Sequence, residues 1–425
     1  MELKTLKDVD LTKKRVILRV AYDITLKEKN GTMEIPDDTR IRATLPTIQH
    51  LLEKRCAIVL ITWLKRPGGK VVEKMRLDPV AKKLSELINK PVKKVNDCVG
   101  PEVQHALTQL KSGELLMLEN TRFHPEEEAD DPVFAEELAK AGECIVFDAF
   151  AHAHRKHAST TGILKILPAC AGFLMEKEMT TLDRILQQPE RPFVALLGGV
   201  KISDKVGVLK ALVEICDAIL IGGALANTFL KAQGKDIGAS LAESEMIDKK
   251  KLDPLKAAQE ILQRAETKET TLVGLQNRSA LQLPVDFIAA QAREEGAKTQ
   301  QVSLEGTIKG VKNRLPSLDA WMFLDIGPKT RFAYQNILSQ AKTILWNGPV
   351  GAFETKGFEQ GTKRLAQYIA SQTQHATTVT GGGDTEAAIT AFHLNGKFTH
   401  NSTGGGAMLK FLSGKELPVL HYLVR

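Results

Sequence analysis

Glycine-rich turns follow five short apolar segments in the second half of the chain. These segments are rich in Val, Ile and Leu without alternation, as expected for buried strands of a parallel sheet. Ligands bind beyond the carboxyl ends of such strands, and glycine lets backbone N–H groups approach phosphate oxygens. Five turns at one sheet edge therefore predict anion or nucleotide binding and not merely tight turns. They are Gly198-Gly199-Val200-Lys201, Gly222-Gly223-Ala224, Asp325-Ile326-Gly327-Pro328, Asn347-Gly348-Pro349-Val350-Gly351 and Gly381-Gly382-Gly383-Asp384-Thr385.

Charged residues accompany two of these turns. Lys201 and Lys205 are four residues apart at the predicted start of a helix over 205–216, which would place them on one face. A solvated face would explain the pair, but cations are unfavourable at a helix N-terminus, so phosphate binding suits it better. Asp384 follows three glycines at another predicted helix start. Spacing alone leaves two roles open for it, an N-cap or a ligand of Mg²⁺ on a nucleotide.

The first half of the chain carries arginines at the corresponding positions. Arg66, Arg122 and Arg155 each follow a predicted strand, and Arg40 lies between the first strand and its helix. Because guanidinium groups pair bidentately with phosphate and carboxylate, four of them at one edge predict a clamp for a small polyanion. One half of the chain would then hold a nucleotide and the other a phosphorylated acid.

Three nearby histidines, His152, His154 and His157, have a spacing that suggests a metal site. No matching carboxylate or cysteine set accompanies them, and Arg155 and Lys156 would repel a cation. The sequence therefore disfavours a metal here.

The elements that must position these residues alternate between strands and helices. Helical patterns such as 44–54, 77–88 and 131–141 separate the apolar segments, and this βαβ rhythm predicts doubly wound α/β architecture. Two such blocks are separated by a predicted helix over 176–186 that ends before two prolines. The predicted strands cover 16–20, 57–62, 115–118, 144–147, 193–197, 218–221, 283–289, 322–324, 343–346 and 377–380.

Composition limits the class of protein. The 425 residues are 43% hydrophobic and 26% charged, as in a soluble protein of two or three domains. We expect no membrane span and no signal peptide, since no apolar run approaches the roughly 20 residues a bilayer requires. The net charge of +7 favours anionic partners, and 5% aromatic residues without a basic run favour a small phosphorylated ligand over nucleic acid. Five cysteines without a CxxC pair predict free thiols in a reducing compartment, hence a cytoplasmic location.

Nine motifs in this order resemble phosphoglycerate kinase, and they extend over nearly the whole chain. The matching segments are 37–42 (DDTRIR), 118–124 (LENTRFH), 153–155 (AHR), 198–205 (GGVKISDK), 226–230 (ANTFL), 324–330 (LDIGPKT), 346–349 (WNGP), 381–384 (GGGD) and 402–406 (STGGG).

The resemblance implies two Rossmann-like domains joined by a hinge helix. It places a domain for 3-phosphoglycerate at 1–174, the interdomain helix at 175–192, a nucleotide-binding domain at 193–398, and a C-terminal segment at 399–425 that returns to the first domain. The implied protein is a cytoplasmic, monomeric, hinge-bending enzyme. It reversibly transfers a phosphoryl group between 1,3-bisphosphoglycerate and ADP, giving 3-phosphoglycerate and ATP, with Mg²⁺.

The resemblance also assigns residues to sites. Around the transferring phosphoryl group it places Arg40, Lys205, Gly382 and Gly383. The implied acid contacts are Ala21, Tyr22, Asp23, Arg40, Trp63, Leu64, Lys65, Arg66, Arg122 and Arg155. The implied nucleotide contacts are Gly198, Gly199, Lys201, Lys205, Gly222, Gly223, Asn347, Glu354, Gly382, Gly383, Asp384 and Thr385, with Asp384 facing the metal.

Departures from the family pattern cluster on the acid side. The usual Arg-Val-Asp-Phe-Asn-Val-Pro is RVAYDIT at 19–25, so a carboxylate is missing at Ala21 and an Asn is replaced by Asp23. A usual His is Trp63, and a usual Thr is His152. Three interpretations follow: an active kinase with an altered acid pocket, a catalytically weak nucleotide-binding paralogue with a regulatory role, or a kinase of another phosphorylated carboxylic acid.

The chemistry fits the resemblance. Phosphoryl transfer needs alignment and charge neutralisation, and both acceptors are already ionised, so no general base is required. Acyl phosphates hydrolyse readily, which favours closure of the domains to exclude water.

Overall fold

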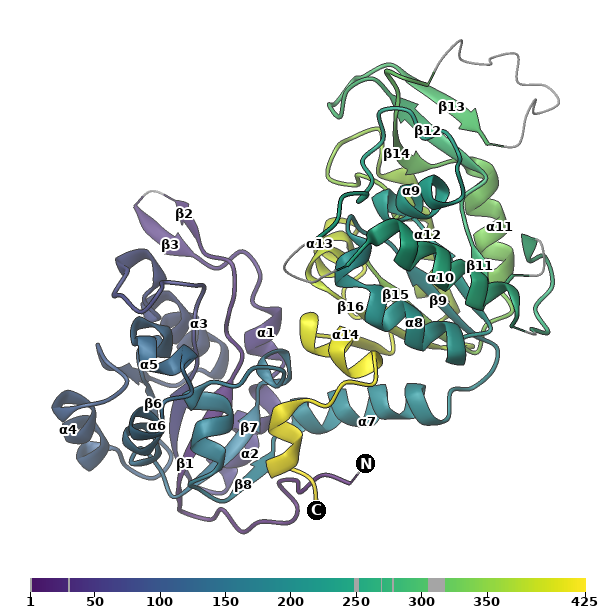
Figure 1. Cartoon of the computed structure of the whole chain (residues 1–425). Coiled ribbons are helices and arrows are strands. Elements are labelled where there is room, and N and C mark those ends of the chain that lie inside the picture. The colour runs from purple at the N-terminus through teal and green to yellow at the C-terminus, as the bar shows by residue number, and fades with distance from the viewer. Residues whose placement is uncertain (1, 30, 248–251, 269, 277–278, 305–317) are drawn as a thin grey trace. The chain divides into compact units, whose positions relative to one another are not determined.

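The chain forms two compact units in a computed structural model that describes residues 2–29, 31–247, 252–268, 270–276, 279–304 and 318–425. Unit 1 comprises Met1–Asp183 with Glu416–Arg425, and unit 2 comprises Arg184–Lys415. Each contains a six-stranded sheet with helices (Figure 1). The predicted α/β fold class with two doubly wound sheets is confirmed. Among the described residues, no helix combines the length and apolar character needed to cross a bilayer.

The sheet of unit 1 is parallel throughout and has the order β5-β6-β4-β1-β7-β8. Side chains of helices α2 (Leu45–Glu53) and α3 (Asp78–Ile88) pack against alternate residues of its central strands in one core. The intervening residues, such as Ile17 and Val59, are also fully buried, so both faces are covered and the strands show no polar alternation. The strands are β1 (Arg15–Val20), β4 (Ala57–Ile61), β5 (Val92–Lys94), β6 (Leu115–Met117), β7 (Cys144–Asp148) and β8 (Ala169–Ala171).

Helix α7 (Phe173–Gln187) contains the division between the units, and its first turn is held by unit 1. The N–H of Phe173 donates to Thr47 Oγ1 at 3.0 Å, and the N–H of Met175 donates to Asp148 Oδ1 at 3.0 Å. These acceptors satisfy N–H groups that a helix start leaves without an internal partner.

The main sheet of unit 2 is also parallel, with the order β11-β10-β9-β15-β16-β17. The chain moves outward from β9 first toward β10 and later toward β15, which creates a topological switch point at β9. The strands are β9 (Phe193–Leu197), β10 (Ala218–Ile221), β11 (Leu281–Gln282), β15 (Thr343–Asn347), β16 (Thr377–Gly381) and β17 (His400–Ser402). The helices are α8 (Val206–Ile215), α9 (Gly223–Ala232), α10 (Pro254–Glu266), α11 (Pro328–Leu338), α12 (Gln360–Gln372), α13 (Gly383–Ala391) and α14 (Gly406–Leu412).

A second, antiparallel sheet in unit 2 corrects one prediction. It has the order β13-β12-β14, formed by Thr299–Ser303, Asp286–Ala290 and Met322–Ile326. The turn containing Gly327 therefore does not lie at the edge of the parallel sheet, and four glycine turns share that edge instead of five. A buried apolar run looks the same in either kind of sheet, so its sequence does not name its partner strands.

The segment 416–425 belongs to unit 1, whereas β17 and α14 belong to unit 2. Its 3-10 helix, Pro418–Tyr422, is followed by an antiparallel bridge between Val424 and Leu3. The Arg425 guanidinium pairs with Glu2 at 2.6 Å and also with Asp8. Unit 1 is thus assembled from two distant stretches of chain.

Candidate active site

Unit 1 gathers its predicted anion-binding residues at the carboxyl edge of four neighbouring strands. In the order β6-β4-β1-β7, the loops after these strands carry Arg122, residues 63–66, residues 21–23 and Arg155. Because parallel strands end at the same edge, the topology brings together residues that are far apart in the sequence.

The loop after β4 is held in place by polar contacts from the other loops. Lys65 has a positive φ of 59°, its N–H donates to Asp23 Oδ1 at 2.9 Å, and its carbonyl accepts from Arg122 Nη1 at 2.7 Å. Asn120 exchanges two hydrogen bonds with the backbone of Leu64, at 3.1 and 2.8 Å. Asp23 therefore anchors this loop, and the Lys65 side chain remains exposed.

Trp63 lies at the centre of a buried cluster. Its side chain is 1% exposed, so it offers no surface to a ligand in this conformation. The Cζ atoms of Arg19 and Arg122 lie 4.3 and 4.4 Å from its ring centroid. The imidazoles of His152 and His157 stack nearly parallel to it, with centroids 3.8 and 5.0 Å away.

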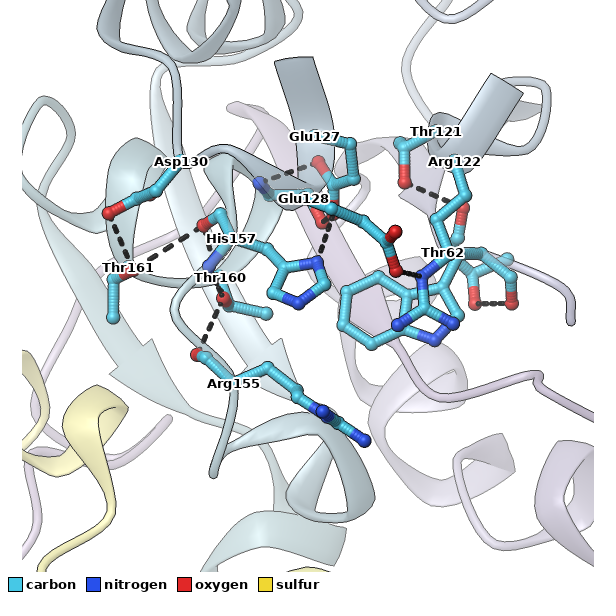
Figure 2. A network of polar contacts seen from close by, with 12 residues as sticks. Thr62, Thr121, Arg122, Glu127, Glu128, Asp130, Arg155, His157, Thr160 and Thr161 are labelled. Carbon is cyan, nitrogen blue, oxygen red and sulfur yellow. Dashed lines mark hydrogen bonds and ion pairs between the residues drawn. The ribbon is translucent and has the colours of Figure 1, made fainter. Parts of the chain in front are cut away.

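A buried acid balances part of this positive charge. Glu127 accepts hydrogen bonds from Ser159 Oγ at 2.5 Å and Ser159 N–H at 3.0 Å, and His157 Nδ1 lies 3.9 Å from it (Figure 2). Arg19 Nε donates to the Ser159 carbonyl at 3.0 Å. Burial lowers the pKa of Arg19 to about 9, although the Glu127 carboxylate favours its charged form. Sequence reasoning missed Arg19 and Glu127, and the available signal was an arginine inside the apolar strand β1.

Three of the four arginines of the predicted clamp have no carboxylate partner among the residues that the structure describes. Arg40 and Arg155 are partly buried and Arg66 is exposed. The backbone carbonyl of Arg155 accepts from Thr160 Oγ1 at 2.9 Å, and Figure 2 shows its side chain extending away from that contact. Arg122, in contrast, forms an ion pair with Glu128 at 3.2 Å (Figure 2). Three guanidinium groups thus keep their charge available for an external anion.

The first predicted contact segment, residues 21–23, is less open than the sequence suggests. Ala21 is 6% exposed, and the Tyr22 side chain is fully buried, with its hydroxyl 2.6 Å from Thr44 Oγ1. Only Asp23 is partly exposed. The structure therefore leaves Asp23 as the one side chain of this segment with solvent access.

Unit 2 joins its glycine turns into one surface by backbone contacts. The N–H of Gly198 donates to the Asn347 carbonyl at 3.0 Å, and that of Gly199 donates to the Pro349 carbonyl at 2.9 Å. A Cβ on Gly198 would lie 1.9 Å from the Pro349 oxygen, so only glycine permits this approach.

The turn after β10 joins the same surface. The N–H of Gly223 donates to the Val350 carbonyl at 2.9 Å, and a Cβ on Gly222 would lie 2.4 Å from the Val350 side chain. Gly223 has φ of +66° and begins α9. The loops after β9, β10 and β15 are therefore fixed to one another.

The N-terminus of α13 completes this surface. Gly382 has φ of +105° and precedes the helix, while Asn347 Nδ2 donates to the Gly381 carbonyl at 2.6 Å. Thr385 Oγ1 donates to the same carbonyl at 2.9 Å and accepts from the Gly348 N–H at 2.7 Å. The first N–H groups of the helix have no intrahelical partner, so they form an anion site.

Lys205 brings a cation to this surface. Its ammonium group donates to Asn347 Oδ1. Burial lowers the pKa of Lys205 to about 8, and the carboxylates of Asp384 and Asp204 oppose that shift. The group is therefore mostly charged at neutral pH but loses its charge in mildly alkaline solution.

The predicted common helical face of the two lysines is wrong. Lys201 is extended and exposed, a 3-10 turn covers Ile202–Asp204, and α8 begins only at Val206. Lys205 caps the helix, and Lys201 lies outside it. Because the 3-10 turn follows the glycine turn directly, the α-helix begins only after it.

Asp384 is a helical residue and not an N-cap. Gly382 occupies the cap of α13, and no side-chain cap hydrogen bond is present. The exposed carboxylate of Asp384 makes no hydrogen bond within the described part of the chain, and it interacts electrostatically with Lys205. Of the two roles that spacing left open, its free oxygens fit the hard-cation role.

Within the ranges that the structure describes, no contact of its side chain brings Glu354 to the glycine turns. It is exposed and pairs with Arg293 Nη2 at 3.0 Å.

One other group of residues has metal-ligand chemistry. Asp97, Cys98 and His124 bring ligand atoms within 4.8 Å of one another, the single such group in the described ranges. His124 Nε2 already lies 2.7 Å from Asp97 Oδ1, and burial raises the pKa of the Cys98 thiol well above its usual value. The three residues are satisfied as a hydrogen-bonded pair beside a buried thiol.

Comparison with known proteins gives consistent results. The family model described as "Phosphoglycerate kinase" matches residues 6–415. A phosphoglycerate kinase of Moorella thermoacetica is 47% identical over 414 residues, covering 97% of each chain. A solved phosphoglycerate kinase from Coxiella burnetii is 37% identical with a TM-score of 0.80, covering 99% of this chain and 98% of that one. Another, from Pyrococcus horikoshii OT3, is 34% identical with a TM-score of 0.81 and the same coverage.

Proposed function

The chain belongs to the phosphoglycerate kinase family, and we propose that it reversibly transfers a phosphoryl group between 1,3-bisphosphoglycerate and ADP, giving 3-phosphoglycerate and ATP. The observation that carries the proposal is a pair of complementary anion sites. Unit 1 presents three arginines, Arg40, Arg66 and Arg155, that have no carboxylate partner among the described residues, and unit 2 presents a helix N-terminus beside Lys205.

We assign the phosphorylated acid to unit 1. Arg40, Arg66 and Arg155 would bind its phosphate and carboxylate oxygens, since guanidinium groups pair bidentately with both. Arg122 would complete the clamp while it holds the Lys65 carbonyl. The family's missing carboxylate at Ala21 is not replaced directly, because Asp23 is already engaged by the Lys65 N–H.

We assign the nucleotide to unit 2, with its phosphates against the glycine turns and the first turn of α13. Lys205 would neutralise charge on the transferring phosphoryl group, and Arg40 would do so from the acid side. Asp384 would hold Mg²⁺, which when bound neutralises charge on the phosphate oxygens of the nucleotide.

The proposed phosphoryl transfer needs no general base. A carboxylate and a nucleotide phosphate are already ionised, so positioning and neutralisation are the tasks left to the protein. Exclusion of water would protect the acyl phosphate from hydrolysis. We further propose a cytoplasmic location, since all five cysteines are free and buried, as suits a reducing compartment. We also propose a monomer, as the resemblance to the family implies.

A coupled assay with 3-phosphoglycerate and MgATP tests the proposal. The unmodified protein should turn over at least a hundredfold faster than a Lys205→Ala control, which removes the cation but leaves the acid side intact. Turnover equal to that of the control at millimolar substrate would refute the activity. Parallel reactions with other phosphorylated carboxylic acids would show whether the altered acid pocket has a different substrate.

A further inference from the structure

Trp63 is the point where four ligand-side groups meet in unit 1. Two guanidinium carbons, of Arg19 and Arg122, lie within 4.4 Å of its ring centroid. Two imidazoles, of His152 and His157, stack on it at interplanar angles of 21° and 29°. The resemblance implies that Trp63 contacts the substrate, but its side chain is 1% exposed and lies buried beside the guanidinium groups.

The cluster holds the two guanidinium cations close together, and its two imidazoles add no further positive charge. Burial, together with the nearby arginines, lowers the pKa of His157 to about 4 and that of His152 well below its usual value, so both imidazoles are neutral at pH 7. An aromatic face attracts cations, and Trp does so more strongly than other side chains. The indole thus partly offsets the repulsion between Arg19 and Arg122.

The contacts of Arg122 determine which of its atoms remain for a ligand. Nη1 donates to the Lys65 carbonyl at 2.7 Å, and Nε faces Glu128 at 3.2 Å. The Cζ of Arg122 lies 4.4 Å from the centroid of the Trp63 ring. Nη2 has no hydrogen bond within the part of the chain that the structure describes. Two of the three guanidinium nitrogens are therefore engaged within the protein, and Nη2 is left as a donor for a ligand.

We propose that Trp63 is a positioning residue, an indole platform that stacks with His152 and holds the Arg122 guanidinium in the orientation in which it binds the phosphorylated acid. This inference rests on the proposed function of unit 1. The family pattern has His and Thr at positions 63 and 152, and the two replacements contact each other here. They therefore form one feature of this chain instead of two unrelated changes.

Kinetics of graded variants test the platform. Trp63→Ala should raise KM for 3-phosphoglycerate about tenfold, because one cation–π contact of a desolvated pair is lost, corresponding to about 1.4 kcal/mol. Trp63→Phe, which keeps an aromatic face, should recover part of this loss. Because a ground-state contact is affected, kcat and KM for MgATP should change less than twofold. The control Trp321→Phe alters an indole in unit 2 and should change neither constant.

A double variant separates a platform from a merely structural residue. If His152 acts through the indole, His152→Thr should raise the acid KM in the unmodified protein but have no further effect in a Trp63→Ala background, since contacting residues are not additive. Additive effects, or a loss of thermal stability with both KM values unchanged, would overturn the inference.

Fluorescence provides a test that does not depend on turnover, with Trp63→Phe as the reference for the emission of Trp63. The emission difference between the unmodified protein and Trp63→Phe should change on titration with 3-phosphoglycerate alone and stay constant with ADP alone. No change with the acid would count against the platform. Absence of kinase activity with a normal emission response would refute the proposed reaction but leave the platform supported.

Discussion

The charge of Lys205 should set the alkaline limit of the reaction. Its pKa is lowered to about 8 by burial, and the amine is charged below that value. The charged fraction is then about 0.9 at pH 7 and about 0.1 at pH 9, so kcat/KM for MgATP should fall about tenfold over this interval. Since kcat/KM reports the free enzyme, its midpoint should lie near pH 8.

Two further expected results make this prediction specific to Lys205. In the nucleotide complex, phosphate oxygens favour the charged amine of Lys205. The alkaline fall in the pH profile of kcat should therefore occur at higher pH than the fall in the profile of kcat/KM. Asp384→Asn should move the limb in kcat/KM to lower pH, because the carboxylate of Asp384 raises the pKa of Lys205.

Lys205→Arg is the matched control. A guanidinium group stays protonated through pH 9, so its profile should lack the alkaline limb even if its absolute rate is lower. Initial rates should be measured by direct detection of nucleotide, which avoids the pH dependence of coupling enzymes. If Lys205→Arg shows the same tenfold fall, the limb belongs to another group and the assigned role of Lys205 is refuted.

Three further predictions concern the metal, the acid loop and the glycine turn. Asp384→Ala should weaken ADP binding about tenfold with Mg²⁺ but less than twofold without it, as measured by calorimetry; equal losses would exclude the metal role. Ala21→Asp combined with Asp23→Asn should give a lower KM for 3-phosphoglycerate than Ala21→Asp alone, because the single variant places two carboxylates near an anion; identical steady-state constants would remove this loop from the acid site. Gly382→Ala should raise KM for MgATP and cost about 1–3 kcal/mol in thermal unfolding, since φ is +105° and the new Cβ would lie 2.7 Å from a buried side-chain nitrogen. Gly396→Ala, with φ of +73° and open space, is its control and should leave KM unchanged.

The sequence was sufficient to predict the parallel sheets but not all of their neighbours. Phe193–Leu197 and Ala218–Ile221 have the predicted bounds, because buried parallel strands read as uninterrupted apolar runs. The same signal was misleading at Met322–Ile326, which pairs antiparallel in a separate sheet. Thr299–Ser303 was missed because its polar sequence lacks that signal.

Some of the site residues could be predicted from the sequence, and others could not. Residues at or shortly beyond the ends of strands, such as Asn347 and Arg122, could be placed at a sheet edge from topology alone. The buried position of Trp63 could not be predicted, because it depends on Arg19 in β1 and on the loops after β6 and β7. Arg19 was missed since a charged residue inside an apolar strand has no spacing signature. Its partner Glu127 is more than a hundred residues away in the sequence.

The two-part construction of unit 1 has a consequence for synthesis on the ribosome. Unit 2 is contiguous, so it can fold once Lys415 has emerged, whereas unit 1 must wait for the ten residues that follow. Leu417, Val419, Leu420 and Leu423 are all nearly fully buried, so an unfinished unit 1 would expose the apolar surface that they cover. The Val419 N–H reaches the Ala153 carbonyl at 3.5 Å, in the loop that leads to Arg155. The arginine clamp can therefore be completed only after the whole of unit 2 has been synthesised.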